Sequence, residues 1–151
     1  MIEDEQASCM MHHPIHVGNL SVTFLKSRHE TEGAFDLFEV TVPPFAYMKV
    51  PHLHREYDET IIGMNGIATW TVGGRRIQVA PGQQLEIPRG TAHGYSNHHP
   101  KTCRMLCLLT PGIVGPEYFR EMAAVLRADG PPDIAGLAAV MNRYGVIPST
   151  A

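Results

Sequence analysis

Turn-forming residues recur at short intervals through the middle of the chain, and they constrain its fold more than any other feature. Asn65-Gly66, Gly73-Gly74 and Pro81-Gly82 each separate short runs of apolar residues. Asn-Gly and Gly-Gly pairs tolerate the positive φ angles of tight hairpin turns, and proline cannot donate to a sheet ladder. The pattern predicts about nine or ten short strands with a turn roughly every 8 to 12 residues, which is typical of an all-β sandwich or barrel.

The chain is expected to divide into three parts. Residues 1–19 form an N-terminal segment that is partly disordered or an edge strand, residues 20–112 the barrel, and residues 113–151 a helical extension. The predicted strands cover residues 20–25, 34–42, 47–54, 59–64, 67–72, 75–79, 84–87, 93–97 and 103–109. Gly115-Pro116 opens a first α-helix, and Gly130-Pro131-Pro132 separates it from a second at about 133–144. Their apolar stripes predict packing against the barrel or a partner subunit.

Composition and charge exclude several classes of function. Hydrophobic residues make up 44% of the chain, enough for one core, and the net charge is only −3. Lys and Arg are scattered without a basic stripe, so no nucleic-acid partner is expected. No run of 18 apolar residues exists, and the acidic N-terminus does not resemble a signal peptide. The three cysteines are an odd count that fits a reducing compartment, so a cytoplasmic location without membrane contact is expected.

His52-Leu53-His54 is the first candidate for chemistry. Side chains two apart in a strand point to the same face, so both imidazoles face one side of the sheet. Met48 and Val50 share that side, which makes it the inward one. Two inward histidines at this spacing can both reach one ion.

Glu59 and His93 are the further candidate ligands. Glu59 follows His54 by five residues, so in an unbroken strand the two side chains would point to opposite faces. Residues 55–58 are polar and predict a chain reversal, after which Glu59 can face the same side as the histidines. His93 begins another strand, and Tyr95 shares its face. Three imidazoles and one carboxylate suit one divalent transition metal ion, Fe, Mn, Ni, Co, Cu or Zn, better than Mg or Ca. Four protein ligands leave an open position for substrate.

At these positions the sequence resembles the cupin superfamily. The spacing of the first cupin motif is matched by His52, His54, Glu59 and Gly66. The spacing of the second is matched by Gly82, Pro88, Gly90, His93 and Asn97. One departure is visible, because Ala46 stands where many cupins carry a glycine, but this is not a ligand position. The resemblance implies a double-stranded β-helix, the cupin or jelly-roll barrel, with His52, His54, Glu59 and His93 as metal ligands.

A narrower resemblance points to bacterial single-domain cupins that are quercetin-dioxygenase-like. It rests on stretches such as Pro51 to Arg55, Asp58 to Thr60 and the tail from Thr110 to Gly145. It implies a homodimer and, in the enzymes that it resembles, a ligand glutamate that also takes the substrate hydroxyl proton, the role open to Glu59. The predicted pocket residues for a flat ring are Met48, Val50, Ile61 and Tyr95.

Three functions remain open from the sequence. The first is an oxygenase that acts on a small aromatic or enolic substrate, in the manner of quercetin 2,3-dioxygenase. The second is a metal-dependent isomerase or lyase that acts on a sugar acid or carbonyl compound. The inward positions are mostly apolar, and Glu86 lies between Leu85 and Ile87 with an outward orientation expected, which disfavours the second. The third is a non-catalytic module that binds a small molecule, because cupins host many functions on one scaffold.

Overall fold

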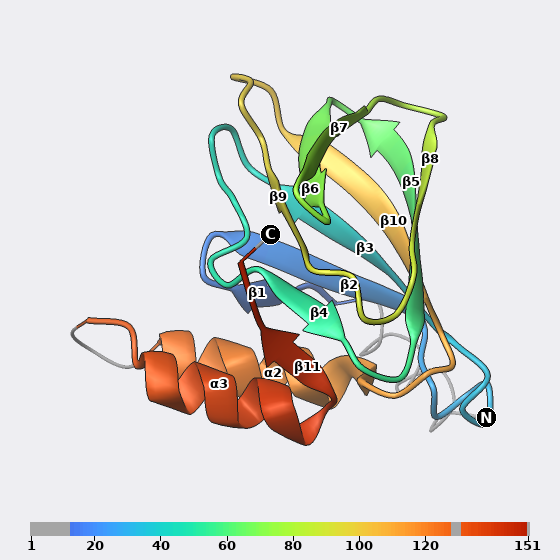
Figure 1. Cartoon of the computed structure of the whole chain (residues 1–151), viewed down its shortest axis with the longest axis vertical. Coiled ribbons are helices and arrows are strands. Elements are labelled where there is room, and N and C mark those ends of the chain that lie inside the picture. The colour runs from blue at the N-terminus through green and yellow to red at the C-terminus, as the bar shows by residue number, and fades with distance from the viewer. Residues whose placement is uncertain (1–12, 128–130, 151) are drawn as a thin grey trace.

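Two antiparallel sheets face each other in the computed structural model, which describes residues 13–127 and 131–150 (Figure 1). The six-stranded sheet has the order β1 (Ile15–Val17), β2 (Leu20–Lys26), β3 (Asp36–Val42), β10 (Cys103–Thr110), β5 (Asp58–Asn65) and β8 (Gln84–Ile87). The five-stranded sheet has the order β11 (Val146–Pro148), β4 (His52–His54), β9 (His93–Ser96), β6 (Ala68–Val72) and β7 (Arg75–Val79). Cys9 and the rest of residues 1–12 lie outside the described residues.

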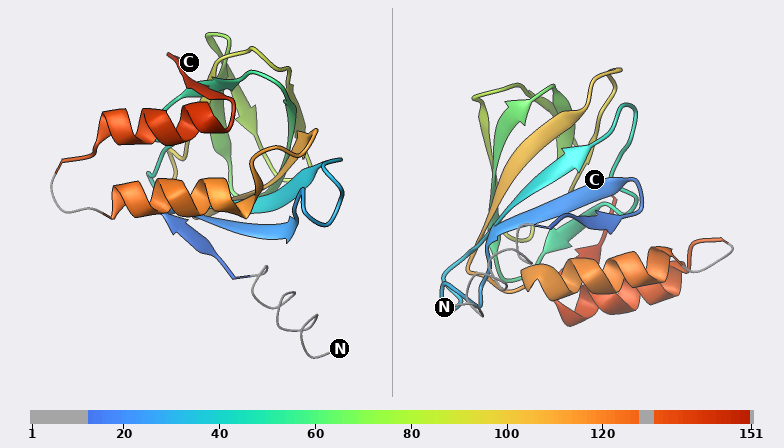
Figure 2. Two further views of the ribbon diagram at one scale, coloured as in Figure 1. Left: turned by 90° about the horizontal axis from the view of Figure 1, so that it is seen from below. Right: turned by 180° about the vertical axis from the view of Figure 1, so that it is seen from behind.

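Two helices follow the barrel, as the sequence predicts. They are α2 (Gly115–Leu126) and α3 (Ile134–Arg143), and they lie side by side across one end of the sheets (Figure 2). α2 packs against β1, and α3 against β11. The predicted all-β class with two C-terminal helices is therefore confirmed. Neither described helix has the length and hydropathy needed to span a membrane.

Two strands differ from the sequence expectation. β4 covers only His52–His54, whereas a strand over residues 47–54 was predicted. Pro51 directly precedes β4 and has no amide hydrogen to donate, which ends the ladder there. β11 was not predicted at all; it pairs with β4, with Val146 opposite His54 and Pro148 opposite His52. The short strand that carries two histidines is thus held by the far end of the chain.

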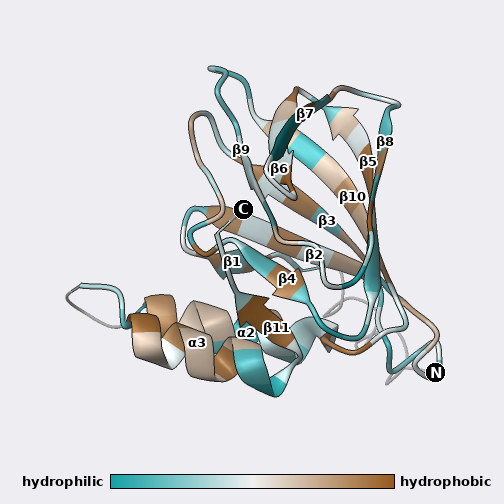
Figure 3. Ribbon diagram, viewed as in Figure 1, coloured by the Kyte–Doolittle hydropathy of each residue, from teal (hydrophilic) through white to brown (hydrophobic). Residues whose placement is uncertain are grey.

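The core lies between the two sheets and extends under α2. Buried and half-buried residues alternate along β3 and β10, so each strand directs one set of side chains inward. The bands of brown and paler residues along β2 and β10 in Figure 3 show the same alternation. Phe24, Phe38 and Phe119 meet with ring centroids 5.1 to 5.8 Å apart, which joins α2 to the six-stranded sheet.

A buried carboxylate ties the start of α2 to the turn between β2 and β3. Asp36 is fully buried and accepts hydrogen bonds from the backbone N–H groups of Arg28 at 2.7 Å and Gly115 at 3.2 Å. The Arg28 guanidinium also pairs with Glu117 in the first turn of the helix at 2.6 Å. Both contacts cross the boundary between barrel and extension, so α2 is held in a defined position over the barrel.

Asn97 is expected to be essential for stability, and replacing it with alanine tests this. Its side-chain amide donates to the carbonyl groups of Val42, Pro43 and Lys101, and its oxygen accepts from the His99 amide. Removing this buried amide leaves several groups unpaired and should lower the free energy of unfolding by about 1–3 kcal/mol. Urea denaturation measures this directly.

The matched control for that experiment is Asn142→Ala. Asn142 is exposed on α3, where its amide donates only to the Ala138 carbonyl group. Its removal should change stability by no more than about 0.5 kcal/mol. Equal effects of the two substitutions would contradict the structural role given to Asn97.

Candidate metal centre

Three imidazoles meet at one point inside the barrel. His52 and His54 lie on β4, and His52 is directly opposite His93 of the neighbouring strand β9. The ring centroids of the three residues are 4.6 to 5.1 Å apart. One ring nitrogen from each lies within 4.8 Å of the others, so the three could together hold a metal ion.

Backbone carbonyl groups orient two of the rings. Nδ1 of His52 lies 2.9 Å from the Val50 carbonyl oxygen, and Nδ1 of His93 lies 2.9 Å from that of Thr91. Because carbonyl oxygens only accept, each Nδ1 carries the proton and each Nε2 offers a lone pair. Nε2 of His93 is buried and has no hydrogen-bond partner. A buried nitrogen of this kind needs a partner, and a transition metal ion fits it.

The environment keeps two of these imidazoles neutral. Burial, together with the neighbouring His93, lowers the pKa of His52 to about 3, and burial likewise lowers the pKa of His54. A histidine must be deprotonated at the nitrogen that binds a metal, so both rings are in the ligand form at neutral pH. For His93, burial acts to lower the pKa, but the nearby Glu59 carboxylate outweighs it and the pKa is raised.

Glu59 lies beside the histidines at the start of β5. Its Oε2 is 3.3 Å from Nε2 of His93 and 3.7 Å from Nδ1 of His54, and the side chain is buried. The chain reverses between β4 and β5, so the carboxylate reaches the face that the histidines occupy. The structure brings together all four residues that the cupin motifs mark, while the role of Glu59 as a fourth ligand stays a prediction.

Local contacts lock the two motifs together. The Tyr57 ring stacks on His54 with centroids 4.4 Å apart, and its buried hydroxyl group has no hydrogen-bond partner. The amide of Gly90 donates to the His54 carbonyl oxygen at 2.7 Å. On the surface, Arg89 pairs with Asp58, the residue before Glu59. The loop that precedes His93 is thereby fixed to both β4 and β5.

An apolar cavity of about 120 Å³ has His52, His54 and Glu59 in its wall. Three of the four predicted pocket residues, Met48, Val50 and Tyr95, lie in its wall. The fourth, Ile61, does not line the cavity and was wrongly placed there. It shares a face with Glu59 but lies further along β5, between Leu85 and Cys107, where the barrel is closely packed and Ile61 is fully buried.

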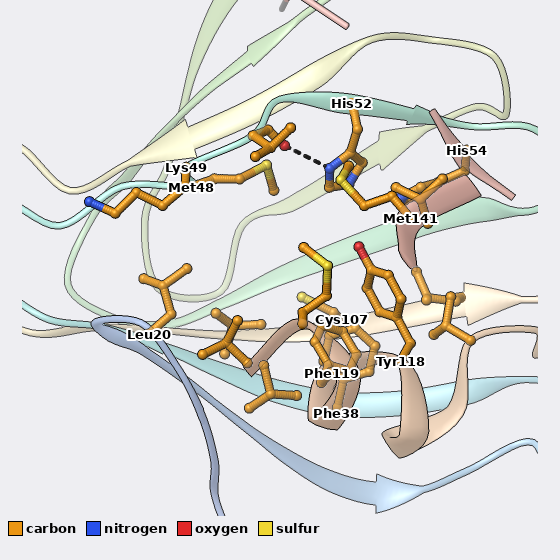
Figure 4. A pocket seen from close by; sticks show the side chains of 18 of the residues that line it. Leu20, Phe38, Met48, Lys49, His52, His54, Cys107, Tyr118, Phe119 and Met141 are labelled. Carbon is orange, nitrogen blue, oxygen red and sulfur yellow. Dashed lines mark hydrogen bonds between the residues drawn. The ribbon is translucent and has the colours of Figure 1, made fainter. Parts of the chain in front are cut away.

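The two helices supply cavity residues that the sequence analysis missed. Tyr118 and Met122 from α2 and Leu137 and Met141 from α3 line the cavity. Figure 4 shows the Tyr118 hydroxyl group directed across the pocket toward the side that carries the histidines. No described residue forms a hydrogen bond with this hydroxyl group, and burial and the Glu59 charge raise its pKa, so it stays protonated. Helical periodicity predicts a buried face, but it does not distinguish packed core from cavity wall.

Comparisons with known proteins agree with this architecture. Residues 38–109 match the family described as the cupin domain. No curated protein sequence matches the chain significantly. Among solved structures, KdgF from a Halomonas species shares 19% sequence identity with a TM-score of 0.59, and covers 66% of this chain and 86% of its own.

Two further structures have similar barrels. The polyketide cyclase RemF from Streptomyces resistomycificus shares 28% identity with a TM-score of 0.56, covering 66% of this chain and 68% of its own. A sugar phosphate isomerase of the cupin superfamily from Silicibacter pomeroyi shares 20% identity with a TM-score of 0.56, covering 64% of this chain and 62% of its own. Residues 38–109 of this chain therefore match the cupin domain family, and the barrel that contains them has the cupin fold.

Proposed function

We propose that the protein is a metal-dependent oxygenase that acts on a small aromatic or enolic substrate. The observation that carries this proposal is the placement of three imidazoles and the Glu59 carboxylate beside an apolar cavity. His52, His54 and His93, with Glu59, would hold one divalent ion of Fe, Mn, Ni, Co, Cu or Zn. Such an ion would supply a Lewis acid for a substrate oxygen.

The chain's own residues supply the remaining functions. The Glu59 carboxylate accepts the proton of the substrate hydroxyl group, because it is buried beside the histidines and is the only carboxylate that the described residues bring to the cavity wall. The Tyr118 hydroxyl group donates a hydrogen bond to a substrate oxygen, since no described residue accepts a hydrogen bond from it. Val50 and Met141 line the apolar space that holds a ring and limits the access of water.

A sugar acid fits this cavity poorly. Burying a hydroxyl group without a hydrogen-bond partner is unfavourable, and a sugar carries several. The wall is mostly apolar, and among the described residues Lys49 and Glu59 are the only charged groups that line it. The isomerase or lyase hypothesis for sugar acids is therefore the weaker one.

A cyclase is the second candidate, favoured by the 28% identity with the polyketide cyclase RemF. A β-dicarbonyl compound forms an enolate when it loses a proton, which Glu59 is placed to accept. Carbon–carbon bond formation by that enolate consumes no dioxygen. Oxygen consumption therefore separates the two candidates.

The test is an oxygen-electrode assay of protein loaded in turn with Fe²⁺, Mn²⁺, Ni²⁺, Co²⁺, Cu²⁺ or Zn²⁺. The substrates are quercetin, catechol and pentane-2,4-dione, which represent a flavonol, a single-ring diphenol and a β-diketone. A dioxygenase consumes dioxygen in step with substrate, and both atoms of ¹⁸O₂ appear in the products. We expect this result for catechol, for pentane-2,4-dione, or for both.

Two other outcomes would favour a different function. Conversion of a β-dicarbonyl compound without oxygen uptake would replace the oxygenase with the cyclase. Binding without conversion of any compound, under air and with every metal, would count against both enzymes and favour the binding module.

A further inference from the structure

The cavity volume limits the size of the substrate. About 120 Å³ is less than the roughly 150 Å³ of an engineered apolar cavity that binds benzene. A single benzene-sized ring therefore fills the space beside the histidines. Drug-sized ligands, by contrast, occupy pockets of about 300–1,000 Å³. A substituted ring must therefore extend its substituent toward the surface.

Lys49 lies where the cavity reaches the surface. It is exposed yet lines the cavity, and Figure 4 shows it opposite Leu20 at the end of the pocket away from His54, with its ammonium group directed outward. The ammonium nitrogen lies 4.3 Å from the centroid of the Tyr47 ring, which holds it near the mouth. No carboxylate of the described residues pairs with it. An apolar cavity thus has a negative group beside the histidines and an unneutralised positive group at its mouth.

We propose that the substrate is a single-ring phenol or enol of similar size that carries an acidic tail, with the tail carboxylate paired to Lys49. This inference rests on the proposed function, because it places the substrate oxygen at the histidine cluster. The ring then fills the apolar space between the two polar ends. A tail longer than the distance to the mouth brings no further gain, so the affinity levels off with tail length.

Catechols with and without a carboxylate test the proposal. The acidic probes are 3,4-dihydroxyphenylacetate, 3-(3,4-dihydroxyphenyl)propanoate and 5-(3,4-dihydroxyphenyl)pentanoate, and the neutral probes are 4-methyl-, 4-ethyl- and 4-butylcatechol. Binding to Co²⁺-loaded protein is followed anaerobically by the visible absorption of the ion. At low ionic strength, at least one acid should bind about two- to fivefold more tightly than its neutral counterpart, the range of an exposed ion pair. High salt should remove the difference.

Lys49→Met should abolish the preference for the acid and leave the affinity for the neutral catechol unchanged. The matched control is Lys101→Met, which removes the same charge from an exposed residue outside the cavity wall. If acids and neutral catechols bind equally to the wild type, or if the two variants behave alike, the proposal for Lys49 is wrong while the proposed function stands. If no catechol perturbs the Co²⁺ spectrum, the proposal for Lys49 is wrong, and the oxygen-electrode assay with pentane-2,4-dione then decides whether the proposed function stands.

Discussion

Protein in which alanine replaces His93 is expected to retain no stoichiometric transition metal. His93 is the most buried of the four candidate ligand residues, and its buried Nε2 atom has no hydrogen-bond partner among the described residues. Alanine offers no ligand atom in its place. Because a bound ion stabilises the folded state, metal should raise the melting temperature of the wild type by about 5–10 °C, at free metal near 100 times Kd, and leave the variant unchanged. Element analysis and thermal denaturation measure the two effects.

His98→Ala is the matched control for this prediction. His98 is exposed in the loop after β9 and contacts Ser96, outside the three-histidine cluster. Protein should be dialysed against a weak chelator before analysis, since exposed histidines such as His13 and His16 also attract metal ions. Full metal content in the His93 variant, or equal loss in both variants, would rule out the proposed centre.

Glu59→Gln should lower turnover of the substrate found in the oxygen-electrode assay by about 10²–10⁴-fold, the usual contribution of a general base. Glutamine keeps the shape and an oxygen atom of the side chain, but it cannot accept a proton at neutral pH. Steady-state rates should be measured on samples whose metal content is determined in parallel.

The metal content of a slow Glu59→Gln variant shows whether Glu59 acts in proton transfer or as a metal ligand. Loss of activity with full metal supports proton transfer by Glu59, whereas loss of both shows that the carboxylate is required as a ligand. Glu86→Gln is the control, because Glu86 is exposed on β8 and should have no effect on either. Wild-type turnover with full metal in the Glu59 variant would end its proposed catalytic role.

The position of the cluster was predictable because strand geometry and turns are local properties. The alternation of side chains put His52 and His54 on one face, and the reversal before β5 brought Glu59 to the same face. His93 followed from its place after a turn, and its pairing with His52 agrees. Here, short-range patterns determine which way each candidate ligand points.

The cavity wall was less predictable because it depends on long-range packing. Tyr118 and Met141 come from helices that follow the barrel in sequence, and an apolar helical stripe looks the same whether it faces a filled or an empty space. Ile61 was wrongly placed because its face was known but its depth along β5 was not. β11 escaped prediction because three residues that include a proline show no alternation to detect.

The pairing of β11 with β4 has a consequence for the order in which the protein assembles. β4 is only three residues long, and the segment that covers its outer edge follows about 90 residues later. Contacts over such separations form slowly, because the entropy of closing the loop is lost before the contact is gained. During synthesis β4 therefore gains this neighbour only after residues 146–148 have emerged, and we expect any capture of a metal ion by His52 and His54 to follow that step rather than to nucleate folding.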